Sequence, residues 1–372
     1  MRALVTGGAG FIGSHLACAL VASGADVRVL DNLLPQAHPT GEPRNVPREA
    51  EFLLGDVTDP EAVLRALHGV EVVFHMAAMV GNGQSMLDIR RYTDINVVGT
   101  ATLVEAMVKA ERRPSRLIVS SSMVVYGDGA YACPEHGSGV PTERPAERLL
   151  ARLWEPVCSG CGREVASIAT GEGHRLAPTS TYGTSKRAQE ELALVLGRAH
   201  ALPTIALRYL NTYGSRQALA NPYTGVCAIF ATRVLNGRAP HVFEDGQQLR
   251  DFIHVSDVVR ANIRAATTSN RAALYRPFNV GTGARRPIVD IARAVARGLG
   301  RDLWPTVTGE FREGDIRHCF ADVSAAEEAL GFRAEVGLDE GFEEFLSWAA
   351  RETPDDRTEE ANEELRRGGM IR

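Results

Sequence analysis

The sequence predicts an α/β protein, in which a doubly wound parallel sheet with helices on both faces is joined to a smaller C-terminal α/β lobe. Short β-branched runs alternate with longer helical patterns through the first half of the chain, and this alternation is typical of parallel sheets. From about Asn211 the alternation loosens into loops rich in Asn, Pro, Tyr and Gly. The length of 372 residues exceeds the roughly 150 of an average domain. We therefore expect two lobes that form one unit.

The strands and helices are expected in an alternating order. The expected strands are Arg2–Val5, Val27–Leu30, Glu51–Leu54, Glu71–His75, Arg116–Ser120 and Thr204–Arg208. The helical patterns between them cover Ile12–Ser23, Pro60–Leu67, Asp94–Ala110 and Tyr182–His200, and three shorter helices follow at Val226–Leu235, Val255–Ala266 and Ile288–Leu299. Because parallel neighbours need a crossover connection, the first half should form right-handed βαβ units.

The domain boundaries follow from this pattern. Residues 1–210 should form the first domain, and residues 211–350 should form mainly the second lobe, with about 251–280 returning to the first. Residues 351–372 are rich in charge and are expected to be a frayed helix or tail. A connection at about 128–178 is far longer than the usual four to six residues or so. It should be functional or separately stabilised.

Composition and charge exclude several functional classes. The chain is 44% hydrophobic and 23% charged, as in ordinary soluble globular proteins. Its 46 acidic and 41 basic residues give a net charge of −5 with no basic block, so no nucleic-acid partner is expected. No apolar run reaches the roughly 18–20 residues that span a bilayer, and a glycine-rich turn stands where a signal peptide would carry its apolar stretch. We expect a cytoplasmic protein without a membrane partner.

Three glycines follow the first strand and open the first helix. Gly7 permits a tight turn, Gly10 lets the backbone approach a pyrophosphate, and Gly13 allows close helix–sheet packing. The positive end of the helix dipole adds to the attraction for phosphate. Asp31 ends the next strand, where a carboxylate binds both ribose hydroxyls of an adenosine and repels a 2′-phosphate. The sequence therefore predicts a Rossmann-type fold that binds NAD rather than NADP.

Further cofactor contacts are expected where later strands end. Asp56 and Val57 follow the third strand and should flank the adenine. Met76, Ala77 and Ala78 follow the fourth strand and supply small or flexible side chains beneath the centre of the cofactor.

A tyrosine and a lysine share one face of a predicted helix. Tyr182 and Lys186 are four residues apart, and a nearby ammonium should lower the pKa of the phenol from about 10 toward neutrality. Tyr182 would then act as a general base, and Lys186 would also bond the nicotinamide ribose. Ser120–Ser122 ends the fifth strand, at the sheet edge where such folds bind ligands. A hydroxyl there can join Tyr182 on a substrate hydroxyl.

Together these motifs resemble the extended short-chain dehydrogenase/reductase family, which contains NAD-dependent nucleotide-sugar epimerases and dehydratases. The resemblance covers roughly Met1 to Ala350 apart from the long connection. The residues that carry it are Thr6–Gly13, Leu30–Asn32, Ser120–Gly127, Tyr182 with Lys186, Leu207–Asn211, Arg250–His254 and Asn279–Gly283.

The resemblance implies a role for each residue of these motifs. Ser122, Tyr182 and Lys186 would be catalytic, and NAD would be the cofactor of an enzyme whose substrate is a nucleotide-diphosphate sugar. It also implies substrate contacts from Asn211, Arg250 and Arg312, cofactor contacts from Phe11, Ile12 and Asn32, and a bracing role beside the cofactor for Asn96. Relatives of this kind form homodimers through two helices, for which the candidates are Asp94–Ala110 and Thr184–His200.

The two residues after Ser122 distinguish among the reactions of this family. Dehydratases carry Asp-Glu there and decarboxylases usually keep a glutamate, whereas this chain has Met123 and Val124, which cannot move protons. What remains resembles UDP-galactose 4-epimerases. Three segments are most similar to dTDP-L-rhamnose 4-epimerases: Asn221–Phe230, Phe243–Gln248 and the long connection with Trp154–Pro156. We therefore expect a dTDP-6-deoxyhexose as substrate. The alternatives are a UDP-glucuronate decarboxylase and a non-catalytic NAD-sensing protein.

Four soft ligands fall in the long connection. Cys133-x-x-His136 and Cys158-x-x-Cys161 have the spacing of a structural zinc knuckle. Zinc would explain how a loop with little core of its own is ordered. Unliganded thiols and a disulfide are the alternatives. A catalytic metal is not expected, because hydride transfer to NAD needs none.

Overall fold

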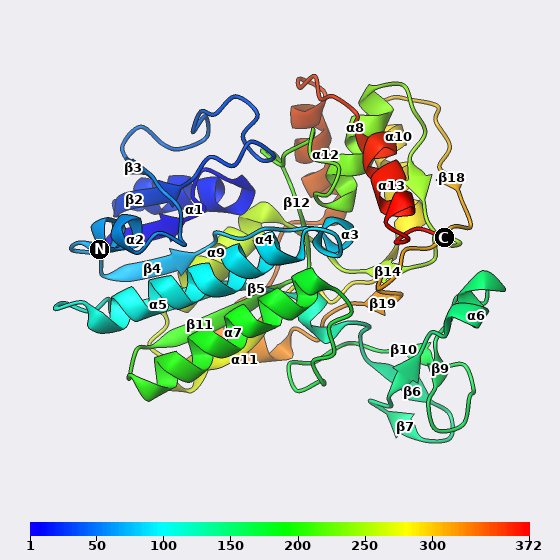
Figure 1. Cartoon of the computed structure of the whole chain (residues 1–372), viewed down its shortest axis with the longest axis horizontal. Coiled ribbons are helices and arrows are strands. Elements are labelled where there is room, and N and C mark those ends of the chain that lie inside the picture. Colours follow the sequence, from blue (N-terminus) through cyan, green and yellow to red (C-terminus); the bar gives the residue numbers. More distant parts are fainter.

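The computed structural model describes residues 1–372, and its centre is a seven-stranded parallel sheet (Figure 1). In spatial order the strands are β16 (Arg276–Val280), β11 (Thr204–Tyr209), β5 (Arg116–Ser122), β4 (Val72–His75), β1 (Arg2–Thr6), β2 (Asp26–Asp31) and β3 (Glu51–Leu54). The chain winds outward from β1 in one direction through β2 and β3 and then in the other through β4, β5 and β11. The predicted α/β class and doubly wound sheet are therefore confirmed.

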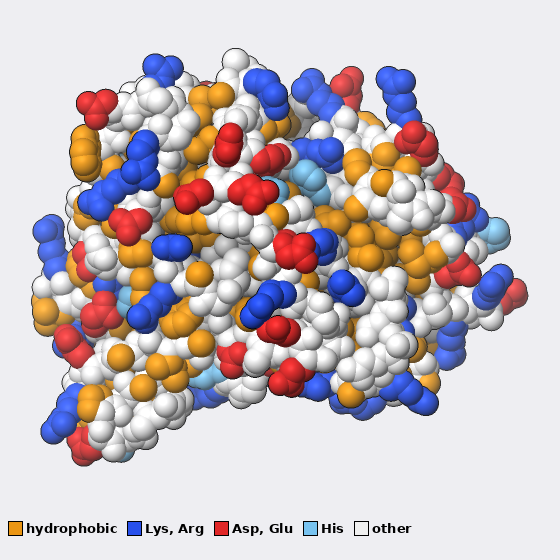
Figure 2. Space-filling view, turned by 180° about the vertical axis from the view of Figure 1, so that it is seen from behind, with side chains coloured by type: hydrophobic (Ala, Val, Ile, Leu, Met, Phe, Trp, Pro, Cys, Tyr) orange, Lys and Arg blue, Asp and Glu red, His pale blue; other side chains and the backbone are white.

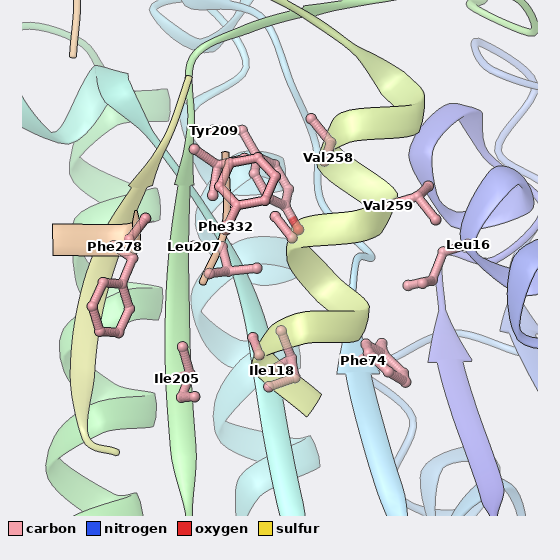
Figure 3. Packing of buried hydrophobic residues seen from close by; sticks show 14 of the residues in the cluster. Leu16, Phe74, Ile118, Ile205, Leu207, Tyr209, Val258, Val259, Phe278 and Phe332 are labelled. Atoms are coloured by element: carbon pink, nitrogen blue, oxygen red, sulfur yellow. The ribbon is translucent and has the colours of Figure 1, made fainter. Parts of the chain in front are cut away.

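Helices cover both faces of the sheet. α1 (Phe11–Ala22), α9 (Val255–Thr267) and α11 (Ser324–Leu330) lie on one face, and α2 (Pro60–Leu67), α5 (Gly99–Lys109) and α7 (Thr181–Ala199) lie on the other. Successive strand residues point to opposite faces, so Val5 packs with α1 and α9 while Leu4 packs with α2 and α5. Figure 3 shows Val259 of α9 beside Leu16 of α1, while Val258 of the same helix points to the side of Tyr209.

The helix predicted over Asp94–Ala110 is interrupted. α3 (Asn82–Ser85) and α4 (Ile89–Thr93) precede it, a π-helical turn follows at Asp94–Val98, and only then does α5 begin. A π turn within a helix often marks a functional position. Here the turn carries Asn96 into the interior, where the residue is fully buried.

The second lobe has a core of its own. α8 (Val226–Leu235), α10 (Ile288–Gly298) and α12 (Leu338–Ala349) pack together around Phe230, Val295 and Phe345. Short strand pairs join them to the main body: β12 (Asn211–Tyr213) with β15 (Phe252–His254), β13 (His241–Val242) with β18 (Thr306–Val307), and β14 (Leu249–Arg250) with β17 (Arg286–Pro287) and β19 (His318–Cys319). Between these pairs the chain returns to the large sheet through α9 and β16.

The long connection forms a small unit that projects from the body at the lower right of Figure 1. It contains β6 (Tyr131–Cys133), β7 (Gly137–Ser138), β8 (Thr142–Glu143), α6 (Ala146–Leu150), β9 (Val157–Cys158) and β10 (Ala166–Ser167). Its interior cluster consists of Tyr131, Cys133, Cys158 and Val165. This unit therefore has very little apolar core.

The C-terminal segment is not the frayed helix or tail expected for residues 351–372. α13 (Thr358–Arg367) packs against the second lobe with Ala361, Asn362 and Leu365 buried. Beyond the helix the backbone of Arg372 exchanges two hydrogen bonds with that of Phe311. The composition of the segment did not indicate a packed helix, because composition does not show that its few apolar residues fall on one helical face and its charged residues on the other.

The surface carries charges of both signs. On the face drawn in Figure 2, Lys and Arg side chains are interspersed with Asp and Glu. No helix combines the length and the hydropathy that crossing a bilayer requires.

Candidate active site

A cavity of about 560 Å³ lies along the carboxyl ends of the central strands and reaches into the second lobe. It begins at the turn after β1, passes the ends of β2, β4 and β5, and ends between α8, α13 and the loop that carries Arg312. This is the edge of a doubly wound sheet where ligands bind. Most of the predicted site residues line this cavity.

The glycine turn forms one end of the cavity. Gly7 has a φ of +65°, and a Cβ there would lie 2.7 Å from the backbone of Ala77. A Cβ on Gly13 would lie 2.2 Å from the carbonyl oxygen of Gly7. Only glycine therefore fits at these two positions, and the turn stays close to the end of β4. The remaining predicted residues of the turn, Gly10, Phe11 and Ile12, also line the cavity.

Asp31 is fixed beside this turn. Its carboxylate accepts hydrogen bonds from the amides of Ala9, at 3.0 Å, and Leu33, at 2.9 Å. Side chains that also line this part of the cavity are Asn32, Val57, Met76, Ala77 and Ala78. A buried acceptor, a glycine-only turn and a helix N-terminus in one place fit the ribose and pyrophosphate of a dinucleotide such as NAD.

Two residues predicted to contact the cofactor do not line the cavity. Asp56 accepts a hydrogen bond from Asn32 Nδ2 at 2.7 Å and holds that side chain in place. Asn96 is fully buried, and its amide group bonds the backbone of Met79 and, at 2.9 Å, the hydroxyl of Ser185. Asn96 thus braces the segment after β4 against α7, the role that the resemblance implied for it.

The serine, tyrosine and lysine meet where β5 and α7 pack together. Ser180 caps α7, because its hydroxyl accepts a hydrogen bond from the amide of Gly183 at 3.0 Å. The first turns of the helix then place Tyr182 and Lys186 on the cavity wall beside Ser122. The hydroxyl of Ser122 accepts a hydrogen bond from the amide of Val124 at 3.4 Å, and Ser122 lies close enough to Tyr182 to lower the pKa of that phenol. Lys186 Nζ donates to the carbonyl oxygen of Ser120 and to Gln189.

Burial determines the protonation states of Tyr182 and Lys186. It raises the pKa of Tyr182 to about 12, and the nearby hydroxyl of Ser122 only partly opposes this shift. Burial also lowers the pKa of Lys186 to about 7, against the attraction of Glu190. The expected lowering of the tyrosine pKa by Lys186 is therefore not seen. The lysine bonds Ser120 and Gln189 instead, and desolvation of the phenolate dominates.

The predicted substrate contacts lie at the other end of the cavity. Arg250 donates to the backbone carbonyls of Ile316 and Arg317, which hold its guanidinium in place. Arg312 bonds the carboxylate of Asp315 at 2.7 Å and lies over the ring of Phe243. Both arginines and Asn211 line the cavity. Guanidinium groups held in this way are suited to a diphosphate.

Several asparagine and glutamine side chains that line the cavity have a buried polar atom without a hydrogen-bond partner. These atoms are Asn211 Oδ1, Gln217 Oε1, Gln248 Oε1 and Asn362 Nδ2. A buried polar atom left unpaired is costly, so a polar ligand in this part of the cavity would stabilise the site. The sequence analysis missed Gln217 and Asn362, because neither belongs to a local motif, and it gave Gln248 no role of its own within Phe243–Gln248.

The four predicted zinc ligands also come together, but away from the cavity. Cys133, His136, Cys158 and Cys161 meet in the projecting unit, outside the residues that line the cavity.

Comparison with known proteins decides the family. The model of the NAD dependent epimerase/dehydratase family matches residues 3–146 and 161–281. The chain belongs to this family. The matched residues include the glycine turn, Ser122, Tyr182 and Lys186. Residues 147–160 of the projecting unit fall outside it.

Named members of the family are similar over almost the whole chain. A dTDP-L-rhamnose 4-epimerase of Burkholderia thailandensis is 35% identical over 355 residues, which cover 94% of this chain and 95% of that protein. The UDP-glucose 4-epimerase of Thermotoga maritima, solved with UDP-glucose, is 30% identical with a TM-score of 0.76 over 94% of this chain and 98% of that one. MoeE5, solved with UDP-glucuronic acid and NAD, is 30% identical with a TM-score of 0.74 over 94% and 99%.

These findings confirm that the protein is an enzyme of the isomerase class and a member of the NAD-dependent sugar-nucleotide epimerase family. They also support NAD as its cofactor. The relatives differ in the sugar nucleotides that their names contain, so the family alone does not define the substrate.

Proposed function

We propose that this protein is an NAD-dependent 4-epimerase of a dTDP-6-deoxyhexose of the dTDP-L-rhamnose type. The observation that carries the reaction type is the Ser122–Tyr182 hydroxyl pair, which is followed on the cavity wall by the apolar side chains of Met123 and Val124. Such a site can oxidise and reduce a hydroxyl carbon but lacks the extra acid and base that dehydration requires. The choice of sugar is supported by the 35% identical dTDP-L-rhamnose 4-epimerase.

The proposed mechanism is a reversible oxidation at C4 of the sugar. Ser122 and Tyr182 hold the 4-hydroxyl between them, and Tyr182 takes its proton. NAD, which the turn at Gly7–Gly13 and Asp31 would hold, would supply the hydride acceptor and donor for C4 when bound. Tyr182 then gives the proton back to the new 4-hydroxyl. Between these two steps the second lobe holds the diphosphate through Arg250 and Arg312, so that the 4-keto sugar turns over without leaving.

The proton transfer requires positive charge near Tyr182. Burial raises the pKa of this phenol to about 12, so it is protonated at neutral pH in this structure. Lys186, one helical turn away, is the source of positive charge within the chain. A shift of its ammonium from Ser120 toward the phenol in the complex would favour the phenolate.

A UDP-glucuronate decarboxylase is the second candidate. It is favoured by MoeE5, whose structure contains UDP-glucuronic acid and NAD. The absence of a glutamate after Ser122 argues against it.

The test is turnover of dTDP-L-rhamnose by the purified protein without added NAD, followed by NMR. We expect the C4 epimer to appear. Release of CO₂ from UDP-glucuronate, or turnover of another sugar nucleotide in place of dTDP-L-rhamnose, would contradict the proposal.

Tyr182→Phe is the matched control for this assay. It keeps the ring and the fold but removes the proton-transferring hydroxyl, so NAD should stay bound while turnover falls by about 10²–10⁴-fold. Unchanged turnover in this variant would remove Tyr182 from the mechanism, and an absence of turnover of dTDP-L-rhamnose by the wild type would contradict the proposed substrate.

We place the enzyme in the cytoplasm, where NAD and nucleotide sugars are both available, and as a homodimer. Residues 1–210 together with about 251–280 would bind NAD, and the rest of 211–350 would bind the sugar nucleotide.

A further inference from the structure

The projecting unit contains the same local motif twice. Cys133-Pro-Glu-His136-Gly137 and Cys158-Ser-Gly-Cys161-Gly162 each place two soft ligands three residues apart and end in glycine. Gly137 has a φ of +76° and Gly162 a φ of +70°, a conformation that residues with side chains rarely adopt. Each glycine therefore turns the chain directly after the second ligand. The motif occurs once after β6 and once after β9.

The four ligand atoms have the spacing of a tetrahedral metal site. Cys133 Sγ lies 3.6 Å from Cys161 Sγ and 3.7 Å from His136 Nδ1, and Cys158 Sγ lies 3.4 Å from the same nitrogen. All four atoms lie within 4.8 Å of one another. Sulfur at about 2.3 Å and nitrogen at about 2.0–2.1 Å from a tetrahedral zinc ion are separated by about 3.5–3.8 Å.

The backbone supports the cluster at two points. The amide of Glu135 donates a hydrogen bond to Cys133 Sγ at 3.4 Å. Hydrogen bonds of this kind orient the ligands of a metal site. Gly160 also lies close to the imidazole of His136, where a Cβ would come within 3.2 Å of the ring.

We propose that Cys133, His136, Cys158 and Cys161 bind one structural Zn²⁺ ion. A ligand set of three sulfurs and one nitrogen in tetrahedral array is typical of zinc. Four protein ligands leave no open position for water or substrate, and the cluster lies outside the catalytic cavity. The metal therefore serves the fold of the projecting unit and not the chemistry at C4.

The unit needs such an ion, because its own core is too small. Two of the four buried residues in its interior cluster are themselves proposed ligands. Metal binding can replace the missing apolar core in a unit of this size.

The projecting unit also contacts the residues beside the loop that carries Arg312, at one end of the cavity. Between the two motifs, Trp154 packs on Phe311, and the carboxylate of Glu155 bonds Arg317 at 2.6 Å and His318 at 2.9 Å. Phe311 and Arg317 flank the loop of Arg312, which lines the cavity. Residues 147–160 lie outside the family match, so this support belongs to the part of the chain that departs from the family.

Metal analysis of the full-length, untagged protein tests the proposal. The protein is purified without chelator or added metal, and we expect about one zinc per chain. Cys161→Ser should lower the zinc content at least about tenfold, because it removes a ligand. Cys18→Ser is the matched control, since Cys18 lies in α1, far from the cluster in sequence and fold, and should leave the content unchanged.

Two further variants keep the test independent of folding. His136 is exposed, so His136→Ala should leave the main body folded while the projecting unit binds zinc more weakly. His136→Cys should keep about one zinc per chain as a four-cysteine site. Cobalt substitution gives a second readout, because tetrahedral thiolate coordination should produce strong visible bands in the wild type that Cys161→Ser lacks. A substoichiometric zinc content, a Cys133–Cys161 disulfide, or iron in place of zinc would each overturn the proposal.

The effect on substrate is measured separately and rests on the proposed function. Removal of zinc should raise KM for the sugar nucleotide severalfold while NAD stays bound. Unchanged kinetics in a zinc-free protein would remove the link to Arg312. Stoichiometric zinc without turnover of dTDP-L-rhamnose would leave the metal site in place and remove the proposed substrate.

Discussion

The proposed mechanism needs a positive charge on Lys186, but this lysine is buried, and burial disfavours the charged form. It is 2% exposed, and burial lowers its pKa from 10.5 to about 7. Between these values the folded protein binds fewer protons than the unfolded chain, so the stability of the fold rises with pH through this window. Below pH 7 the full cost of burying the ammonium is present, and above about pH 10.5 it is gone.

Lys186→Met should therefore stabilise the ligand-free protein while it abolishes activity. We expect the free energy of unfolding to rise by about 1–3 kcal/mol at pH 6, because a buried charge is replaced by a methyl thioether of similar length. The difference from the wild type should shrink as the pH approaches 10. Denaturant titrations at pH 6, 8 and 10 measure it, and a difference that does not change with pH would contradict the assigned cause.

The residues that could be predicted from sequence are those tied to a local motif. Gly7, Asp31, Ser122 and Tyr182 each stand at a strand end or in the first turn of a helix, where short-range pattern fixes the position. The partners of Lys186 could not be predicted. They depend on how α7 packs on β5, which decides that the ammonium bonds Ser120 and Gln189 rather than the phenol.

At the scale of elements, α13 shows the limit of composition as a guide. Its charged face forms ion pairs such as Arg233–Glu359 and Arg366–Glu310, and its narrow apolar face closes the cavity. An isolated helix of this composition would be marginal. Its order comes from partners on α8 and on the loop before Arg312, and these are remote in sequence.

Asn362→Leu should weaken binding of the sugar nucleotide. The amide nitrogen of Asn362 is buried at the cavity wall without a partner, and α13 sits beside the loop that carries Arg312. Loss of one hydrogen bond should raise KM about tenfold, or about 1.4 kcal/mol, with NAD retained. Glu363→Gln, on the exposed face of the same helix, is the control and should leave KM unchanged. An unaffected KM in Asn362→Leu would show that the amide faces no ligand.

At the scale of the whole molecule, the order of the strands along the chain was enough to predict the large sheet. For the second lobe, the sequence predicted that the lobe exists but not how its strands pair. Strand pairs such as β14 with β19 and β12 with β15 join distant segments, and no sequence pattern links them. A homodimer would form through the pair of helices α5 and α7. α5 and α7 lie side by side on the outside of the sheet in Figure 1, and their contact with each other leaves one face of the pair uncovered.

A homodimer through this pair should depend on its exposed apolar residues. Val98, the last residue of the π-helical turn before α5, is 46% exposed, and Val195, on α7, is 59% exposed. Burial of both in each of two copies favours association, because apolar area is removed from water. Val98→Asp combined with Val195→Asp should convert a dimer into a monomer in light scattering. Leu64→Asp, at a 53% exposed position on α2, should not. A wild-type monomer, or a double variant that stays dimeric, would place the interface elsewhere or remove it.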